Sequence, residues 1–208
     1  MKRYFKNKKL LEKNNVYSKD MEHDACGVGL VASTEGKKSR KVVEYGIQAL
    51  KAVWHRGAVD ADGKTGDGAG IHVEISKEFF KEKIEVTGHT YDNSEICIGM
   101  IFLPRNDYEA QENCRTIVEK ELTQNNFSIY GWRQVPVNTK VLGEKAEQTR
   151  PEITQVLFRY NDQKLSGKAL EIKLYETRRK IENNVRQNHL DNFYICLLYT
   201  SDAADDIP

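Results

Sequence analysis

The chain has 208 residues, enough for one domain with a sizeable hydrophobic core. Its 32 lysines and arginines nearly balance 31 aspartates and glutamates, and the net charge of +1 argues against a nucleic-acid or membrane-surface partner. No apolar run approaches the length of a bilayer span, and the basic N-terminus lacks the apolar segment of a secretory signal. The four cysteines are widely spaced without a Cys-x-x-Cys pair, so we expect no zinc site, no disulfide framework and a cytoplasmic location.

Residues 1–25 are polar and rich in lysine, so they offer little apolar surface for a packed core of their own. A frayed terminal arm and a removable leader both fit this composition. Cys26 follows at the start of a glycine-rich apolar stretch, and residues 28–33 predict a central strand because both of its faces are apolar. From the local sequence, Cys26 is either a buried, inert thiol or a nucleophile held at the start of a strand.

A helix is predicted next, from a capping Ser39 to about Trp54. Its apolar side chains form one stripe, which we expect to face a core, at Val43, Ile47, Leu50 and Trp54. The helix ends at His55-Arg56-Gly57. The position of His55 at a helix end favours a capping charge over a catalytic base for Cys26.

Residues 58–70 contain four glycines and three aspartates, which predicts a loop of the kind that often carries function. Within it, Gly63-Lys64-Thr65 has part of a phosphate-loop pattern, but Ala58 stands where that pattern requires glycine. A calcium loop counted from Asp60 also fails, because Thr65 occupies the position that requires glycine. We therefore predict neither a nucleotide site nor a metal site here.

The remaining periodicities indicate a mixed α+β protein. They predict, in order, a strand at 69–75, a helix at 77–84, a strand at 96–103, a helix at 107–122, an extended segment at 127–135, a strand at 153–160, a helix at 169–185 and a strand at 193–199. These strands are too many for a helical bundle, and there is no regular β-α-β alternation with a phosphate loop. The fold class predicted is α+β, with sheets packed on each other and helices outside.

A thiol nucleophile needs a base, and the α-amino group of the same residue is one candidate. Its pKa of about 8 leaves a useful fraction neutral at physiological pH. This route requires Cys26 to be the first residue of the mature chain, and it needs neither a histidine nor a metal.

Three segments together resemble the N-terminal glutaminase domain of glutamate synthases, which are class II glutamine amidotransferases. They are residues 23–32, His55-Arg56-Gly57 and the loop at 62–70. Class II amidotransferases in general share the cysteine and the His-Arg-Gly, whereas the loop is typical of glutamate synthase. The resemblance extends over about residues 24–196, and also includes residues 99–104, 131–137, 141–143 and 150–153.

The resemblance implies a four-layer αββα N-terminal-nucleophile (Ntn) hydrolase fold that is incomplete at the C-terminus. It divides the chain into a leader at 1–25, a partial amidotransferase domain at 26–196 and a tail at 197–208 whose acidic end looks non-native. Cleavage between Ala25 and Cys26 would free the catalytic Cys26, which would attack glutamine and release ammonia.

The resemblance also implies which residues surround Cys26. Arg56 and Gly57 would bind substrate at the pocket wall, although a structural role fits Arg56 equally well. The pocket loop beside them would comprise Asp62, Gly63, Thr65, Gly66, Asp67 and Gly68. No metal ligand is implied.

In the parent enzyme that the resemblance implies, ammonia passes to a downstream synthase domain and reacts with 2-oxoglutarate. FMN and an iron–sulfur cluster are expected there and not in this segment, with a small subunit or ferredoxin as electron donor. The family's residues for the substrate carboxylate and the oxyanion would follow Cys196, so we expect little glutaminase activity from these 208 residues alone. The alternatives are another class II amidotransferase, feeding ammonia to a sugar phosphate or a purine precursor, and an inactive scaffold.

Overall fold

The computed structural model describes residues 6–7, 9–10, 13, 27–162 and 164–199. It divides the chain into two compact units, Met1–Leu30 and Val31–Pro208. Cys26, the predicted nucleophile, lies outside the described residues. Among the helices that are described, none is long and apolar enough to cross a membrane.

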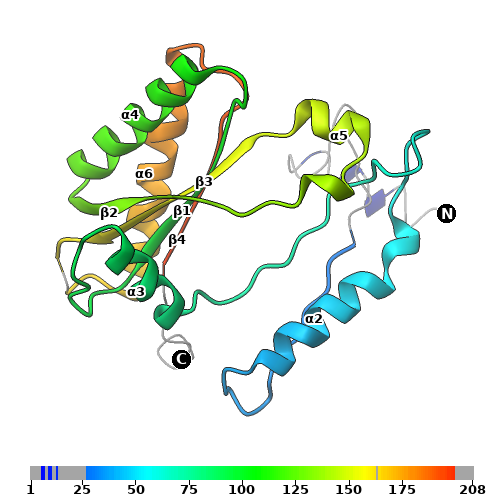
Figure 1. The fold of residues 1–208 in the computed structure, drawn as a ribbon. Coiled ribbons are helices and arrows are strands. Elements are labelled where there is room, and N and C mark those ends of the chain that lie inside the picture. Colours follow the sequence, from blue (N-terminus) through cyan, green and yellow to red (C-terminus); the bar gives the residue numbers. More distant parts are fainter. Residues whose placement is uncertain (1–5, 8, 11–12, 14–26, 163, 200–208) are drawn as a thin grey trace. The chain divides into compact units, whose positions relative to one another are not determined.

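A four-stranded antiparallel sheet lies at the centre of the second unit, in the order β2-β3-β1-β4 (Figure 1). Its strands are β1 (Cys97–Leu103), β2 (Phe127–Gln134), β3 (Glu152–Tyr160) and β4 (Tyr194–Tyr199). The inner strand β1 places Gly99 opposite Val156 on one side and Leu197 on the other, while β2 and β4 are the outer strands. The strands predicted at 96–103, 153–160 and 193–199 are thereby confirmed, and the extended segment predicted at 127–135 forms β2.

The predicted helices are also present. They are α2 (Arg40–Ala52), α3 (Lys77–Val86), α4 (Tyr108–Gln124) and α6 (Gly167–Gln187), joined by a short α5 (Glu144–Thr149) and two 3-10 turns, η1 (Trp54–Arg56) and η2 (Thr139–Val141). Side chains at the helix starts satisfy free backbone N–H groups, as expected for these residue types. Ser39 accepts a hydrogen bond from Lys41 N at 3.2 Å, and Asp107 accepts one from Ala110 N at 2.9 Å.

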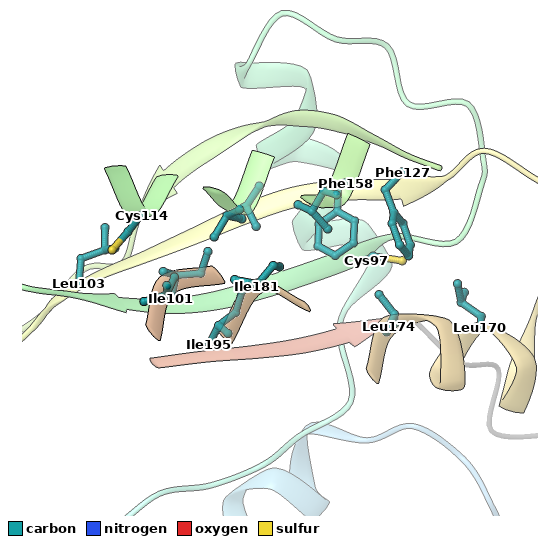
Figure 2. Packing of buried hydrophobic residues seen from close by; sticks show 14 residues of the cluster. Cys97, Ile101, Leu103, Cys114, Phe127, Phe158, Leu170, Leu174, Ile181 and Ile195 are labelled. Carbon is teal, nitrogen blue, oxygen red and sulfur yellow. The ribbon is translucent and has the colours of Figure 1, made fainter. Parts of the chain in front are cut away.

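The main core lies between the sheet and the helices α4 and α6, which cover the same face (Figures 1 and 2). Alternate residues of β1 point into it, and the helices contribute residues three or four apart. The members labelled in Figure 2 are Cys97, Ile101, Leu103, Cys114, Phe127, Phe158, Leu170, Leu174, Ile181 and Ile195. The buried residues of α4 and α6 thus lie along one face of each helix.

A second, smaller core lies on the opposite face of the sheet. Ile98 and Leu157 belong to it, although their neighbours along each strand belong to the main core. Ile84 at the end of α3 packs there, together with Ile96 and Tyr130. A register shift between Ile129 and Gly131 in β2 turns Tyr130 toward this face.

Two predicted strands, at 28–33 and 69–75, are wrong for the residues that the structure describes. Neither segment is in a ladder, and Val28 and Ile71 are exposed. An alternating apolar pattern becomes a strand only where a neighbouring strand accepts its backbone hydrogen bonds, and no described residue does so here.

The apolar stripe of α2 is also less buried than predicted. None of the thirteen described residues of α2 is buried, and Trp54 beyond its end is 75% exposed. The backbone of α2 at Gly46 lies close to Ile71, which follows the glycine loop: a Cβ at Gly46 would lie 3.2 Å from Ile71 Cδ1.

Candidate functional site

The glycine loop after η1 folds back on itself as a short hairpin over residues 58–67, called the 58–67 hairpin below. Val59 and Gly66 form a β-bridge, and the Asp60 amide donates to the Thr65 carbonyl at 2.7 Å. Gly63 stands at the turn with φ of +68°, a backbone conformation that favours glycine. The sequence predicted a loop at this position, and the structure gives it a closed, hydrogen-bonded form.

The three aspartates of the loop accept backbone N–H groups from the hairpin itself. Asp67 Oδ2 accepts from Ala58 N at 2.9 Å, and the Asp67 amide donates in return to the Ala58 carbonyl at 3.2 Å. Asp60 Oδ1 accepts from the amide of the next residue, Ala61, at 2.6 Å. Through these bonds the carboxylates close the hairpin. Among the described residues, no group of three His, Cys, Asp or Glu side chains could hold a metal ion.

Asp62 is the most strongly held of the three. Its Oδ1 accepts from Lys64 N at 2.9 Å and Thr65 N at 2.7 Å, and its Oδ2 accepts from the Thr65 hydroxyl at 2.5 Å. The backbone N–H of Glu144, at the start of α5, makes a smaller contribution that also lowers the pKa of this carboxyl. These donors, with the Thr65 hydroxyl foremost, lower the pKa of Asp62 to about 2, so the carboxylate is ionised at neutral pH.

The same face of the hairpin contacts the start of α5. Gly143, the residue before α5, is buried, and a Cβ there would overlap Thr65 Oγ1, Asp62 Oδ2 and Thr65 N. Lys145 Nζ lies 2.6 Å from Asp60 Oδ2 and forms an ion pair with it. The hairpin and α5 are therefore joined by close packing and by charge.

The predicted wall residues lie at the open end of the hairpin. The amide of Gly57 donates to the Trp54 carbonyl at 3.0 Å, which ends η1, and Arg56 is the last residue of that turn. Because Ala58 and Asp67 are bonded to each other, the flanking residues Gly57 and Gly68 are brought to the same end. The structure thus unites Arg56, Gly57 and the loop residues in one local assembly, while Cys26 is not among the described residues.

The family comparison bears on the whole of this assembly. The family model described as glutamine amidotransferases class-II matches residues 26–203, which is most of the chain. The chain belongs to the class II glutamine amidotransferases. In this amidotransferase the match begins at Cys26 and includes the sheet, α4, α6 and the 58–67 hairpin.

Individual relatives of this amidotransferase carry glutamate synthase names. The chain is 53% identical over 184 residues to the glutamate synthase [NADPH] large chain of Azospirillum brasilense, covering 88% of this chain and 12% of the relative. It is 35% identical over 194 residues to the ferredoxin-dependent glutamate synthase of Pyropia yezoensis, covering 91% and 12%. It is 34% identical over 197 residues to glutamate synthase [NADH] of Saccharomyces cerevisiae, covering 90% and 9%. The chain thus spans about one eighth of the length of the first two relatives.

The contribution of α5 to the assembly was not predicted from the sequence. Residues 141–143 and 150–153 are part of the family resemblance, but the sequence predicts no helix between them. Gly143 is the residue that could have indicated this contact. The atoms of Asp62 and Thr65 that leave no room for a side chain there are known only from the structure.

Proposed function

We propose that the chain is the glutaminase part of a glutamate synthase, with Cys26 as the nucleophile. One observation carries the proposal: the match to the amidotransferase family begins at Cys26, the residue that would start the mature chain after loss of residues 1–25. The names of the relatives, in three organisms, support glutamate synthase over other members of the family.

The proposed chemistry uses two groups of the same residue. The α-amino group of Cys26, with a pKa of about 8, accepts the thiol proton, and the sulfur bonds to the side-chain amide carbon of glutamine. The tetrahedral intermediate collapses, the C–N bond breaks, and the nitrogen leaves as ammonia with the proton that the amine held. Water then attacks the thioester, the C–S bond breaks, and glutamate leaves with the thiol restored.

The 58–67 hairpin would form one wall of the glutamine pocket, beside Arg56 and Gly57. Its internal hydrogen bonds support this role, because a wall that is already rigid loses little entropy when substrate binds. The glycines at its open end, Gly57 and Gly68, leave room for a substrate to approach the backbone.

We infer that the complete domain has the four-layer αββα arrangement of Ntn hydrolases, preceded by a leader at 1–25. The antiparallel sheet with α4 and α6 on one face supports this inference, since it supplies one helical layer and one sheet. The apolar second core on the opposite face supports a further layer there.

The parent protein would use the ammonia in a downstream synthase domain, where 2-oxoglutarate becomes glutamate. We expect FMN and the iron–sulfur cluster to be bound in that part of the parent. Cys97 and Cys114 of this segment are wholly buried in its apolar core, which suits packing and not cluster ligation. A small electron-donating subunit or ferredoxin would be the redox partner.

The test is to label the full-length parent with a glutamine-analogue electrophile and to locate the label by mass spectrometry. We expect modification of Cys26 in a chain that begins at residue 26, and no modification in a Cys26→Ser variant. Cys196→Ser is the matched control and should label as the parent does.

Other outcomes of this experiment have distinct meanings. Labelling spread evenly over the cysteines, or an active parent that begins at Met1, would refute the proposal. Labelling at Cys26 in a parent that does not convert 2-oxoglutarate would assign the chain to another class II amidotransferase.

A further inference from the structure

The short helix α5 contacts the 58–67 hairpin on one side and the sheet on the other. On the hairpin side, the Lys145 ammonium pairs with Asp60 at 2.6 Å, and Gly143 packs against Asp62 and Thr65.

Close packing against the hairpin, and not the backbone conformation of Gly143, leaves no room for a side chain at this position. The backbone of Gly143 has φ of −74° and ψ of 164°, an extended conformation that any residue adopts. A Cβ would nevertheless overlap atoms of Asp62 and Thr65, which are held by their mutual hydrogen bonds and cannot retreat cheaply. An alanine at this position would therefore separate the hairpin from α5 without straining the backbone.

On the sheet side, Glu147 joins α5 to the end of β1 through Arg105, and it also bonds to Arg150 at the end of its own helix. Its carboxylate accepts from Arg150 Nε at 3.0 Å and Nη2 at 3.3 Å, and from Arg105 Nη1. Arg105 follows β1 closely and Arg150 shortly precedes β3. These two strand ends are neighbours, because Leu103 at the end of β1 pairs with Glu152 at the start of β3.

We propose that Gly143 and Glu147 are positioning residues for the glutaminase site, and that α5 fixes the 58–67 hairpin to the adjoining ends of β1 and β3. This inference rests on the proposed function, because the hairpin is taken as a wall of the glutamine pocket. Gly143 sets how closely the hairpin approaches α5, and Glu147 sets where α5 lies on the sheet. Through α5, the sheet thereby holds the hairpin and the adjoining Gly57 in place, although the hairpin lies well before β1 in the sequence.

The test compares Gly143→Ala with Gln148→Ala in the full-length parent. Gln148 is an exposed residue of the same helix, and its one recorded bond is to Glu144 within that helix. Hydrogen exchange would follow the amides of 58–67, with those of β1 and β3 as an internal measure of global folding. Glutaminase kinetics would give KM and kcat for glutamine separately.

We expect Gly143→Ala to speed exchange of the hairpin amides by about tenfold or more while β1 and β3 stay protected. We also expect its KM for glutamine to rise by about tenfold or more, because a displaced wall weakens substrate positioning. Gln148→Ala should change neither. Glu147→Gln, which keeps the size of the side chain but loses the charge that faces two arginines, should shift both readouts in the direction of Gly143→Ala.

Unchanged hairpin exchange in Gly143→Ala would overturn the inference whatever the activity, and a loosened hairpin with unchanged KM would overturn the positioning role. If Gly143→Ala does not fold, Thr65→Val removes the hydroxyl on the hairpin side of the same contact and is judged by the same criteria. The proposed function fails separately, through the labelling of Cys26, so the two failures are distinguishable.

Discussion

Among single residues, Asp62 links the ionisation of one carboxyl group to the closure of the hairpin. Its pKa is lowered to about 2, chiefly by the Thr65 hydroxyl and the amides of Lys64 and Thr65. A lowered pKa means that the folded form prefers the carboxylate. The stabilising contribution is therefore complete above the ordinary pKa of about 4 and is lost as the pH falls toward 2.

This linkage predicts that the Asp62 carboxyl titrates well below its ordinary range, and that Thr65→Val raises its pKa toward that range. Carboxyl carbon chemical shifts, followed by NMR from pH 5 downward, measure both values. Thr65→Ser keeps a hydroxyl and serves as the control that should leave the titration low. An Asp62 signal that titrates near pH 4 in the unmodified chain would contradict the prediction.

Gly99 is a second residue whose missing side chain has a measurable consequence. In the buried strand β1, a Cβ at Gly99 would lie 2.7 Å from Val156 Cγ1 and 3.1 Å from Leu197 Cδ2. We expect Gly99→Ala to lower the free energy of unfolding by about 1–3 kcal/mol, since both neighbours are branched side chains in a packed sheet. Urea unfolding followed by fluorescence gives the value.

The matched control for this substitution is Gly70→Ala, because a Cβ at Gly70 would meet nothing within 4 Å. It should leave the free energy of unfolding within about 0.5 kcal/mol of that of the unmodified chain. Equal effects of the two substitutions would show that the loss at Gly99 does not come from the close packing of β1.

On the scale of elements, α6 has one buried row and one exposed face, which permits a comparison within a single helix. Leu174 is 2% exposed in the main core, whereas Ile172 is 51% exposed. We expect Leu174→Ala to cost about 2–5 kcal/mol of unfolding free energy and Ile172→Ala less than about 1 kcal/mol. Thermal or urea unfolding of the two variants tests the difference, and similar losses would contradict the assigned faces of α6.

Elements whose evidence is local in the sequence were predicted well. In α4 and α6 the apolar spacing suffices, and in α4 the capping Asp107 adds to it; Cys114, Val118 and Leu122 are buried at that spacing. The segments 28–33 and 69–75 have apolar patterns typical of strands, yet such a pattern could not reveal whether a partner strand lies beside them.

The candidate site, too, could be predicted only where its residues are close together in the sequence. The sequence singled out Gly57 and the loop aspartates because unusual residues stand close together along the chain. It could not show that Asp60 pairs with Lys145 or that Gly143 packs on Thr65, since those partners are far apart in the chain. Long-range contacts of this kind exist only in the folded chain, so no local pattern indicates them.

On the scale of the whole molecule, the thiols of the main core report how often that core opens. Burial raises the pKa of Cys114 to about 11 and also raises that of Cys97, so the reactive thiolate is scarce as well as hidden at neutral pH. We expect iodoacetamide at pH 7.5 to modify the half-buried Cys196 well before either of them. Mass spectrometry at successive times measures this order.

Denaturant provides the control for that experiment, because Cys97, Cys114 and Cys196 should react at similar rates once the core is unfolded. Rapid modification of Cys97 or Cys114 in the native chain would mean that the sheet and its covering helices separate readily. Slow modification at a common rate would indicate that both thiols become accessible in one cooperative opening.

The outer position of β4 has a consequence for how the chain behaves in concentrated solution. One side of β4 is paired with β1, and the described part of the chain places no strand along its other side. The backbone N–H and C=O groups along such an edge strand can form hydrogen bonds with any extended segment, including the same edge strand of a second molecule. Self-association of the isolated segment should therefore increase with concentration, and a proline at Cys196 or a charged side chain nearby should suppress it.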